Sequence, residues 1–196
     1  MTTPTIVEVP SINVRNIDLK LVGDSALIVH RWSDKARKQM LDKQMKAANK
    51  GREAKDPKAD YEASLYHLDN GQKGYGFPAV AFKAAAVSAC RFVDGIKMTE
   101  ARGAFHVNGD LVKLDGDPEP REDMVRLARG VADIRYRAQF PEWSVLLSIS
   151  YNGDVLSPAQ IVNLFNIAGF GVGVGEWRPE RDGSFGRFHV ANESEV

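Results

Sequence analysis

Cysteine is almost absent from this sequence, and neither sign of charge prevails. Cys90 is the only cysteine among 196 residues, which excludes an intramolecular disulfide and a zinc site built from cysteines. The 26 basic side chains are matched by 26 acidic ones. Binding of a polyanion through net charge is therefore excluded, and any such site has to arise from local clusters of charge.

Long hydrophobic runs are also missing. No segment approaches the roughly 18 consecutive apolar residues that a membrane-spanning helix needs. Residues 1–6 lack the basic region and the apolar core of a signal peptide. We therefore predict no membrane contact and a cytoplasmic location, which fits the low cysteine content. The four histidines show no metal-ligand spacing, so neither a metal nor another cofactor is predicted.

Hydrophobic periodicity predicts the order of the main elements. Helical spacing of apolar residues predicts core helices over 79–93 and 157–168, opened by Pro78 and by Ser157. Alternation of apolar and polar residues predicts strands at 12–22, 26–30, 134–140, 143–151 and 185–191. Without insertions, the order is strand, helix, strand, strand, helix, strand. We therefore predict an α+β fold, with a ferredoxin-like (RRM-like) βαββαβ core in a single domain.

Two segments do not fit this plan and are predicted to be insertions. Residues 31–74 contain a basic helix over 34–49 and a polar, exposed connection around 53–60. Residues 104–123 contain an extra β-hairpin, because Asn-Gly at 108–109 between two apolar runs is a strong two-residue turn signal. The acidic end of this segment, from Asp115 to Asp123, has no periodic apolar face and is predicted to be a surface loop.

The most distinctive segment is a glycine-rich stretch over 169–187, between the second core helix and the last strand. Glycines let a backbone approach a phosphate chain closely and present its amides. Arginines bind phosphate through paired hydrogen bonds, and an aromatic ring offers a stacking surface to a base. A flexible hairpin or a packing loop would have the same composition. A dinucleotide-binding site is not predicted. The glycines of such a site follow a strand and open a helix, whereas the glycines of this chain follow a helix and lead into a strand.

Two motifs resemble those of the RAMP superfamily, the ferredoxin-like proteins that build CRISPR effector complexes and include guide-processing endonucleases. Gly173-Val-Gly175, followed by Gly183-Ser-Phe-Gly186-Arg-Phe, is similar to the glycine-rich loop before their last strand. Phe-Pro-Ala-Val-Ala-Phe-Lys, ending at Lys83, resembles the opening of the first core helix in their backbone subunits. The resemblance implies a RAMP-like domain and a non-catalytic subunit that binds a nucleic-acid strand.

We predict that two groups of side chains bind single-stranded RNA or DNA by neutralising phosphates and stacking on bases. One group lies in the basic segment 31–52, which has eight basic and two acidic residues, and the other lies on the first core helix and in the glycine-rich loop. The predicted binding residues are Lys35, Arg37, Lys38, Lys43, Lys46, Lys83, Trp177, Arg178, Arg181 and Arg187. Gly173, Gly175, Gly183 and Gly186 are predicted to shape the loop, and Trp32 is a second stacking candidate.

The predicted assembly is a homo-oligomer along the strand or a subunit of a larger ribonucleoprotein, since faces of opposite charge can pair head to tail. One alternative is a viral or cellular scaffold protein that acts through protein contacts, in the host cytoplasm if it is viral. Another is a guide-type endoribonuclease that uses His30 or His67. The sequence contains no recognisable catalytic motif. The candidate loop aspartates are Asp34, Asp60 and Asp69, and no motif identifies one of them as catalytic.

Overall fold

Two antiparallel sheets form the framework of the protein. The computed structural model describes residues 8–45, 54–68, 74–126, 130–192 and 194–195. Within these residues, the larger sheet has the strand order β3-β5-β8-β1-β9, and β4 also pairs with β8. Its strands are β1 (Val14–Gly23), β3 (Tyr75–Pro78), β4 (Phe105–Val107), β5 (Leu111–Asp115), β8 (Ser144–Asn152) and β9 (Phe188–Val190). The predicted α+β class is confirmed.

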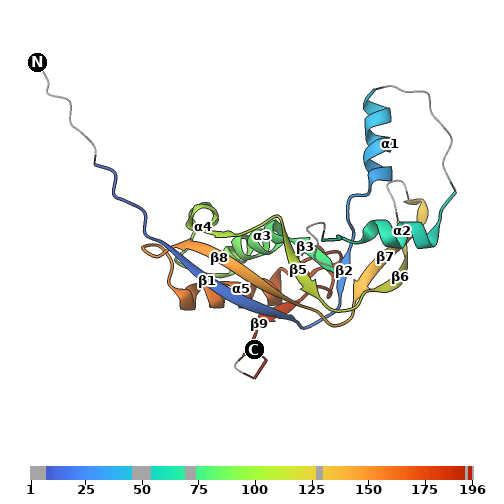
Figure 1. The fold of residues 1–196 in the computed structure, drawn as a ribbon. Coiled ribbons are helices and arrows are strands. Elements are labelled where there is room, and N and C mark those ends of the chain that lie inside the picture. The colour runs from blue at the N-terminus through green and yellow to red at the C-terminus, as the bar shows by residue number, and fades with distance from the viewer. Residues whose placement is uncertain (1–7, 46–53, 69–73, 127–129, 193, 196) are drawn as a thin grey trace, which may run out of the picture.

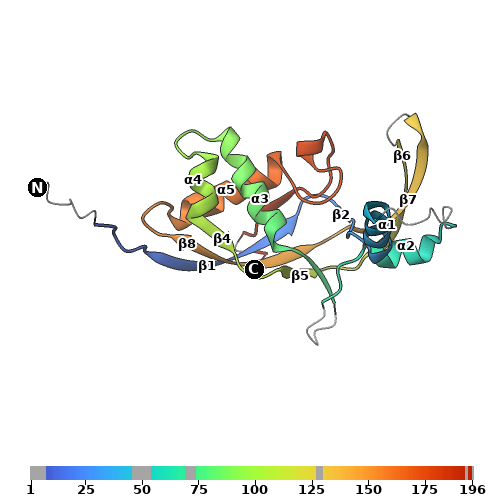
Figure 2. The ribbon, with the colours of Figure 1, turned by 90° about the horizontal axis from the view of Figure 1, so that it is seen from above.

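Three helices cover one face of this sheet, and we call the sheet and these helices the core (Figure 2). They are α3 (Ala79–Ala89), α4 (Met98–Ala104) and α5 (Pro158–Gly171), and a short 3-10 turn, η1 (Cys90–Phe92), follows α3. The start of α5 agrees with the sequence, because Ser157 and Gln160 form a reciprocal capping box.

Alternation of side chains along β8 places the apolar interior on the helix side of the sheet. Leu147 and Ile149 are buried, while Ser148 between them is exposed on the face that no helix covers in Figure 2. Aromatic rings fill the interior: Phe82 from α3 meets Phe188 from β9 edge to face, with 5.9 Å between the ring centroids.

The predicted hairpin across residues 108–109 is wrong. Its two arms, β4 and β5, run in the same direction along β8 and do not pair with each other. Phe105 lies opposite Tyr151, and Leu114 lies opposite Val145. The residues between β4 and β5 bulge away from β8 without reversing the chain. The segment predicted as an insertion therefore supplies the core strand next to β8.

A second, smaller sheet stands at one end of the core with two further helices, and we call this unit the arm (Figure 1). Its strands, in the order β2-β7-β6, are β2 (Leu27–Val29), β7 (Ala132–Phe140) and β6 (Glu119–Arg126). The helix α2 (Pro57–Ser64) packs on β7. The helix α1 (Asp34–Gln44) projects away from the rest of the molecule and has no buried residue.

The arm departs from the sequence-based plan in three places. The sequence predicts a core strand at 134–140, but β7 pairs with β2 and β6. It predicts a surface loop over 115–123, where β6 begins. It predicts an exposed connection at 53–60, where Asp56 caps α2 by accepting a hydrogen bond from the amide of Lys58 (3.1 Å). Both β6 and α2 are too polar to show a clear apolar periodicity.

The basic helix begins where the sequence predicts it. Ser33 is its N-cap, and the Ser33 hydroxyl accepts a hydrogen bond from the amide of Ala36 (3.2 Å). The helix ends at Gln44, so the predicted end at residue 49 and the predicted binding residue Lys46 lie outside the described residues. In the described part of the chain, no helix combines the length and apolar character needed to cross a membrane.

Candidate nucleic-acid interface

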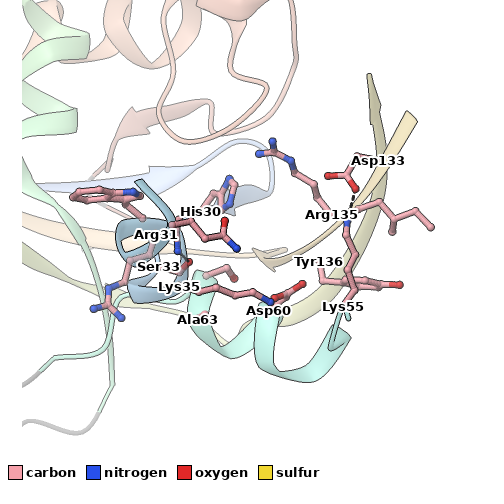
Figure 3. Close-up of a pocket in the computed structure, with 15 residues that line it drawn as sticks. His30, Arg31, Ser33, Lys35, Lys55, Asp60, Ala63, Asp133, Arg135 and Tyr136 are labelled. Atoms are coloured by element: carbon pink, nitrogen blue, oxygen red, sulfur yellow. Dashed lines mark hydrogen bonds and ion pairs between the residues drawn. The ribbon is translucent and has the colours of Figure 1, made fainter. Parts of the chain in front are cut away.

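A cavity of about 510 Å³ lies in the arm between α1, α2 and β7 (Figure 3). Four basic side chains line it, coming from the segment before α1, from α1, from the segment before α2 and from β7: Arg31, Lys35, Lys55 and Arg135. Two carboxylates, two aromatic side chains and a histidine also line it: Asp60, Asp133, Trp32, Tyr136 and His30. The cavity therefore combines an excess of positive charge with aromatic surfaces.

Hydrogen bonds to Ser64 hold the segment that carries Arg31 and Trp32. The amide of Arg31 donates to the carbonyl of Ser64 at the end of α2 (2.9 Å). The Ser64 side chain is buried and accepts a hydrogen bond from the amide of Ala138 in β7 (2.9 Å). Although it is anchored in this way, Trp32 leaves 61% of its surface exposed at the cavity. An exposed indole at a fixed backbone position is suited to stacking on a flat ligand.

The far wall of the cavity is closed by an ion pair. Lys55 Nζ lies 2.6 Å from Asp133 Oδ1, and the same ammonium group donates to the carbonyl of Ile134. This contact joins the segment before α2 to the start of β7. Arg135 follows on β7. Its positive charge helps to lower the pKa of Glu176, which is not part of the cavity lining.

The helix α1 presents only part of its surface to the cavity. At 3.6 residues per turn, Lys35, Ala36 and Gln39 lie on one face, and these three residues line the cavity. The other predicted binding residues of this helix are exposed outside the lining: Arg37, Lys38 and Lys43. The sequence predicts four binding residues in the described part of the basic insertion. Among these four, Lys35 is the residue that lines the cavity.

The glycine-rich loop is closed on itself by backbone hydrogen bonds. A Cβ atom at Gly183 would lie 1.7 Å from the carbonyl oxygen of Trp177, and one at Gly186, where φ is 63°, would lie 1.8 Å from that of Val174. Backbone carbonyls accept hydrogen bonds from the loop amides of Val174, Glu176, Gly183, Phe185 and Gly186. Three of these acceptors lie within the loop, while Glu176 and Gly186 donate to Ile28 and Ala26. These glycines permit close packing of the backbone, and these amides are occupied within the protein.

The loop docks on the arm through a stack of cations and aromatic rings. Arg121 lies over the rings of Phe185 and Trp177, at 4.7 and 5.5 Å from their centroids, and Arg137 lies 5.2 Å from that of Trp177. The Arg137 side chain is only 1% exposed and pairs with Asp123 at 2.8 Å. Trp177, a predicted base-stacking residue, therefore contacts two guanidinium groups of the protein itself, while 36% of its surface is exposed.

Glu176 links this stack to the cavity. It pairs with Arg137 (3.2 Å) on one side and with His30, a cavity residue, on the other (3.5 Å). The hydrogen bond with His30 is the main reason that the pKa of Glu176 lies below its ordinary value, and the charges of Arg137 and Arg135 act in the same direction against burial. Through Glu176, the glycine-rich loop thus contacts His30 in the cavity lining.

The remaining predicted residues are spread over the molecule and do not line the cavity. Arg178 pairs with Glu180 (2.9 Å) and donates to a backbone carbonyl, so its charge serves the loop. Arg181 is exposed, Arg187 is half-buried, and Lys83 contacts His106 (3.1 Å) on the core. Burial would raise the pKa of Glu180, but its contacts with Arg178 and with Arg91 outweigh burial and lower that pKa.

Four basic or aromatic lining residues are not among the predicted binding residues: Arg31, Lys55, Arg135 and Tyr136. Arg31 opens the basic segment 31–52 that the sequence does single out. Arg135 and Tyr136 belong to an Arg-Tyr-Arg sequence in a predicted strand. This interleaving of basic and aromatic residues is a known signal for nucleic-acid contact and could have identified them. Lys55 lies in a polar segment without any such pattern, so only the fold brings it to the cavity. In the described residues, no group of histidine, cysteine or acidic side chains is arranged to hold a metal ion.

Comparisons with known proteins give distant structural similarity. The sequence matches no protein-family model and no curated protein. It is similar to the crystal structure of Cmr6 from Pyrococcus furiosus, with a TM-score of 0.48 and 11% identity over 91% of this chain and 98% of that one. It is also similar to a chain of the Type III-B Cmr-beta bound to cognate target RNA, with the same TM-score, identity and coverage of this chain, and 59% coverage of that chain.

Proposed function

We propose that this protein binds single-stranded RNA or DNA in the arm cavity without catalysis, and that several copies bind along one strand. The observation that carries the proposal is the lining of the cavity, where the basic side chains of Arg31, Lys35, Lys55 and Arg135 share one cavity with the exposed indole of Trp32. Basic side chains attract phosphates, and an aromatic face stacks on any base. Binding of this kind has little sequence preference.

The core is the scaffold for this arm, and we assign it to the ferredoxin-like, RAMP-like plan. Along the chain, its elements follow the order β1, α3, β5, β8, α5, β9. In space, the four strands lie in the order β9-β1-β8-β5, all antiparallel. This crossing of two split βαβ units supports the assignment. The arm then grows from the strand connections at one end of the sheet.

The cavity has the dimensions and the chemistry for a nucleotide. Its volume of about 510 Å³ lies in the usual range for small-ligand sites, roughly 300–1,000 Å³. Arg31 and Arg135 lie on two different walls, so they can hold consecutive phosphates while a base rests on Trp32. The exposed cations of α1 (Arg37, Lys38 and Lys43) continue the positive surface beyond the cavity.

The test is the anisotropy of a fluorescein-labelled 20-nucleotide strand, RNA or DNA, titrated with the protein over a series of salt concentrations. The double variant Arg31→Ala with Arg135→Ala should bind at least about a hundredfold more weakly, because each of the two lost charged hydrogen bonds contributes roughly 1.5–3 kcal/mol. The slope of log affinity against log salt should also shrink by about 1.4, at about 0.7 per phosphate contact.

A matched control removes two cations from the core. Lys97→Ala with Lys113→Ala changes the net charge equally but alters no cavity residue, and Lys113 is already paired with Asp115 (2.6 Å). This control should bind like the unmodified protein. Absence of binding at low salt, or equal losses in both double variants, would overturn the proposal. Cleavage of the RNA strand in the presence of EDTA would instead support the endoribonuclease alternative.

A further inference from the structure

The carboxylate of Asp60 is a cavity group that binding of phosphates does not explain. Asp60 belongs to the first turn of α2, and together with Ala63 and Ser64 it forms the face of that helix that lines the arm cavity (Figure 3). A negative charge in the lining repels phosphates. An acidic side chain among four cations therefore has to contribute to the site in another way.

The two carboxylates of the lining differ in their partners. Asp133 is held by Lys55 at 2.6 Å. Asp60 is half-buried, and within the described chain no hydrogen bond or ion pair engages its side chain. Burial and the neighbouring Glu122 raise the pKa of Tyr136, and the charge of Asp60 adds to this effect, so Asp60 lies near the Tyr136 hydroxyl. That hydroxyl is itself hydrogen-bonded to Glu122, which leaves Asp60 as a free acceptor at the α2 wall.

A free carboxylate distinguishes between bases, because it only accepts hydrogen bonds. The pairing edge of guanine presents two adjacent donors, the ring N1–H and the 2-amino group, which match the two oxygens of a carboxylate. Adenine and cytosine each place an amino group beside a ring nitrogen with a lone pair, and uracil and thymine flank one N–H with two carbonyls. These lone pairs repel a carboxylate. Guanine is therefore the base that an aspartate can bind through paired, charge-assisted hydrogen bonds.

We infer that the arm cavity prefers guanine over the other bases, with Asp60 as the residue that binds its pairing edge. In this arrangement the base stacks on Trp32, while Arg31 and Arg135 bind the neighbouring phosphates. Asp60 on α2 accepts hydrogen bonds from the N1–H and the 2-amino group. Stacking and phosphate contacts are available to every base, so the preference comes from Asp60.

The inference rests on the proposed function and deepens it, because it names the base that the cavity favours. A paired contact between a side chain and a base edge discriminates by about fivefold to a hundredfold. Asp60 is only half-buried, so water competes for its oxygens, and the lower end of this range is expected. A preference of this size acts at the one nucleotide in each cavity and leaves the rest of the strand unread.

The experiment is fluorescence anisotropy with labelled five-nucleotide strands that differ only in the central base, prepared both as RNA and as DNA. The flanking bases are uracil in RNA and thymine in DNA, and the central base is guanine, hypoxanthine, adenine, cytosine or the flanking base itself. The guanine strand should bind at least about fivefold more tightly than the strand of uracil or thymine alone. Hypoxanthine keeps the N1–H but lacks the 2-amino group, so its strand should bind with intermediate affinity.

The variant Asp60→Asn tests the residue itself, because an amide offers one donor and one acceptor in place of two acceptors. The preference for guanine should fall below about twofold. The strand of uracil alone should bind at least as tightly as it does to the unmodified protein, since a negative charge near the phosphates is removed, and this also shows that the variant folds. Glu62→Gln is the matched control: it changes the charge equally on the same helix, at an exposed position outside the lining, and should keep the preference.

The possible outcomes separate the base preference from the proposed function. Failure of every strand to bind at low salt would overturn both. Equal binding of all the strands would overturn the guanine preference alone and would leave binding without regard to the base. A preference for guanine that is unchanged in Asp60→Asn, or lost equally in Glu62→Gln, would overturn the role of Asp60, because the discrimination would then arise elsewhere in the protein.

Discussion

The core and the arm differ in the buried polar contacts that hold them together. The core buries apolar side chains between one sheet and three helices, with rings such as Phe82 and Phe165 fully enclosed. The arm also buries apolar side chains, such as those of Ile28 and Phe140. In addition it contains all three of the buried polar or charged side chains in the described residues, Ser64, Asp123 and Arg137. Apolar packing is strong but tolerant of geometry, whereas buried polar contacts fix distances and directions. The proposed binding site lies in the part whose geometry is fixed by polar contacts.

The largest expected effect is a cavity in the core. Phe165→Ala should lower the free energy of unfolding by about 3–5 kcal/mol, because the ring is fully buried and its loss leaves a void. Leu41→Ala on α1 should change it by less than about 0.5 kcal/mol, since that side chain is half exposed and α1 has no buried residue. Urea denaturation measures both values. Losses of similar size would contradict the division between core and arm.

The next effect is expected at the buried ion pair of the arm. Asp123→Ala leaves Arg137 buried with Glu176 as its remaining carboxylate, and we expect a loss of about 3 kcal/mol. Hydrogen exchange should accelerate in β6 and β7 more than in β1 and β8. Glu180→Ala, which removes a partly exposed partner of Arg178, is the control and should cost less than about 1 kcal/mol. Uniform acceleration over both sheets would mean that the arm does not open on its own.

A smaller effect concerns the glycine-rich loop where it supports the arm. Gly186→Ala should destabilise the protein by more than about 1 kcal/mol, because φ is positive there and a Cβ would meet the Val174 carbonyl. Gly103→Ala in α4 should stabilise it by about 0.5–1 kcal/mol, since nothing lies within 4 Å of the added carbon. Thermal unfolding distinguishes the two directions. Destabilisation by both substitutions would argue against the loop geometry described above.

The smallest effect depends on pH and involves the edge of the core. His189 contacts Glu195 (3.0 Å) and Asp24 (2.6 Å), and the hydrogen bond with Glu195 is the main reason that its pKa lies above the ordinary 6.5. Protonated His189 therefore stabilises the folded state below about pH 6.5, and this contribution is lost as the pH rises through the raised pKa. The difference in stability between the unmodified protein and His189→Ala should follow this course, and a difference that is independent of pH would contradict it.

Where the sequence carried strong local signals, it predicted the structure. The caps at Ser33 and Ser157 place the starts of two helices correctly, because a capping hydrogen bond depends on neighbouring residues alone. The turn signal at 108–109 gave a wrong prediction of a hairpin. A local φ preference does not determine whether the chain reverses or bulges. The partners of β7 could not be predicted, since strand pairing is decided by contacts distant in sequence.

The candidate site was only partly predictable for the same reason. Lys35 and Trp32 belong to a basic segment that is visible in the sequence, and both line the cavity. Lys55 and Arg135 come from segments about 80 residues apart, and the pairing of Lys55 with Asp133 brings them together. The glycines of the loop were predicted to present amides to phosphate, but several of these amides are bonded within the chain. Binding of nucleic acid by the other predicted residues stays a prediction.

The isolation of α1 has a thermodynamic consequence. A helix of 11 residues receives little stabilisation from its own hydrogen bonds in water, and this one has no buried side chain to add to it. Part of the free energy of any contact on either face is therefore spent on ordering the helix. A substitution that raises the helix propensity of α1 on its exposed side should therefore tighten the binding of a strand in the cavity without touching that strand. The stability of this helix sets part of the affinity of a site that it only borders.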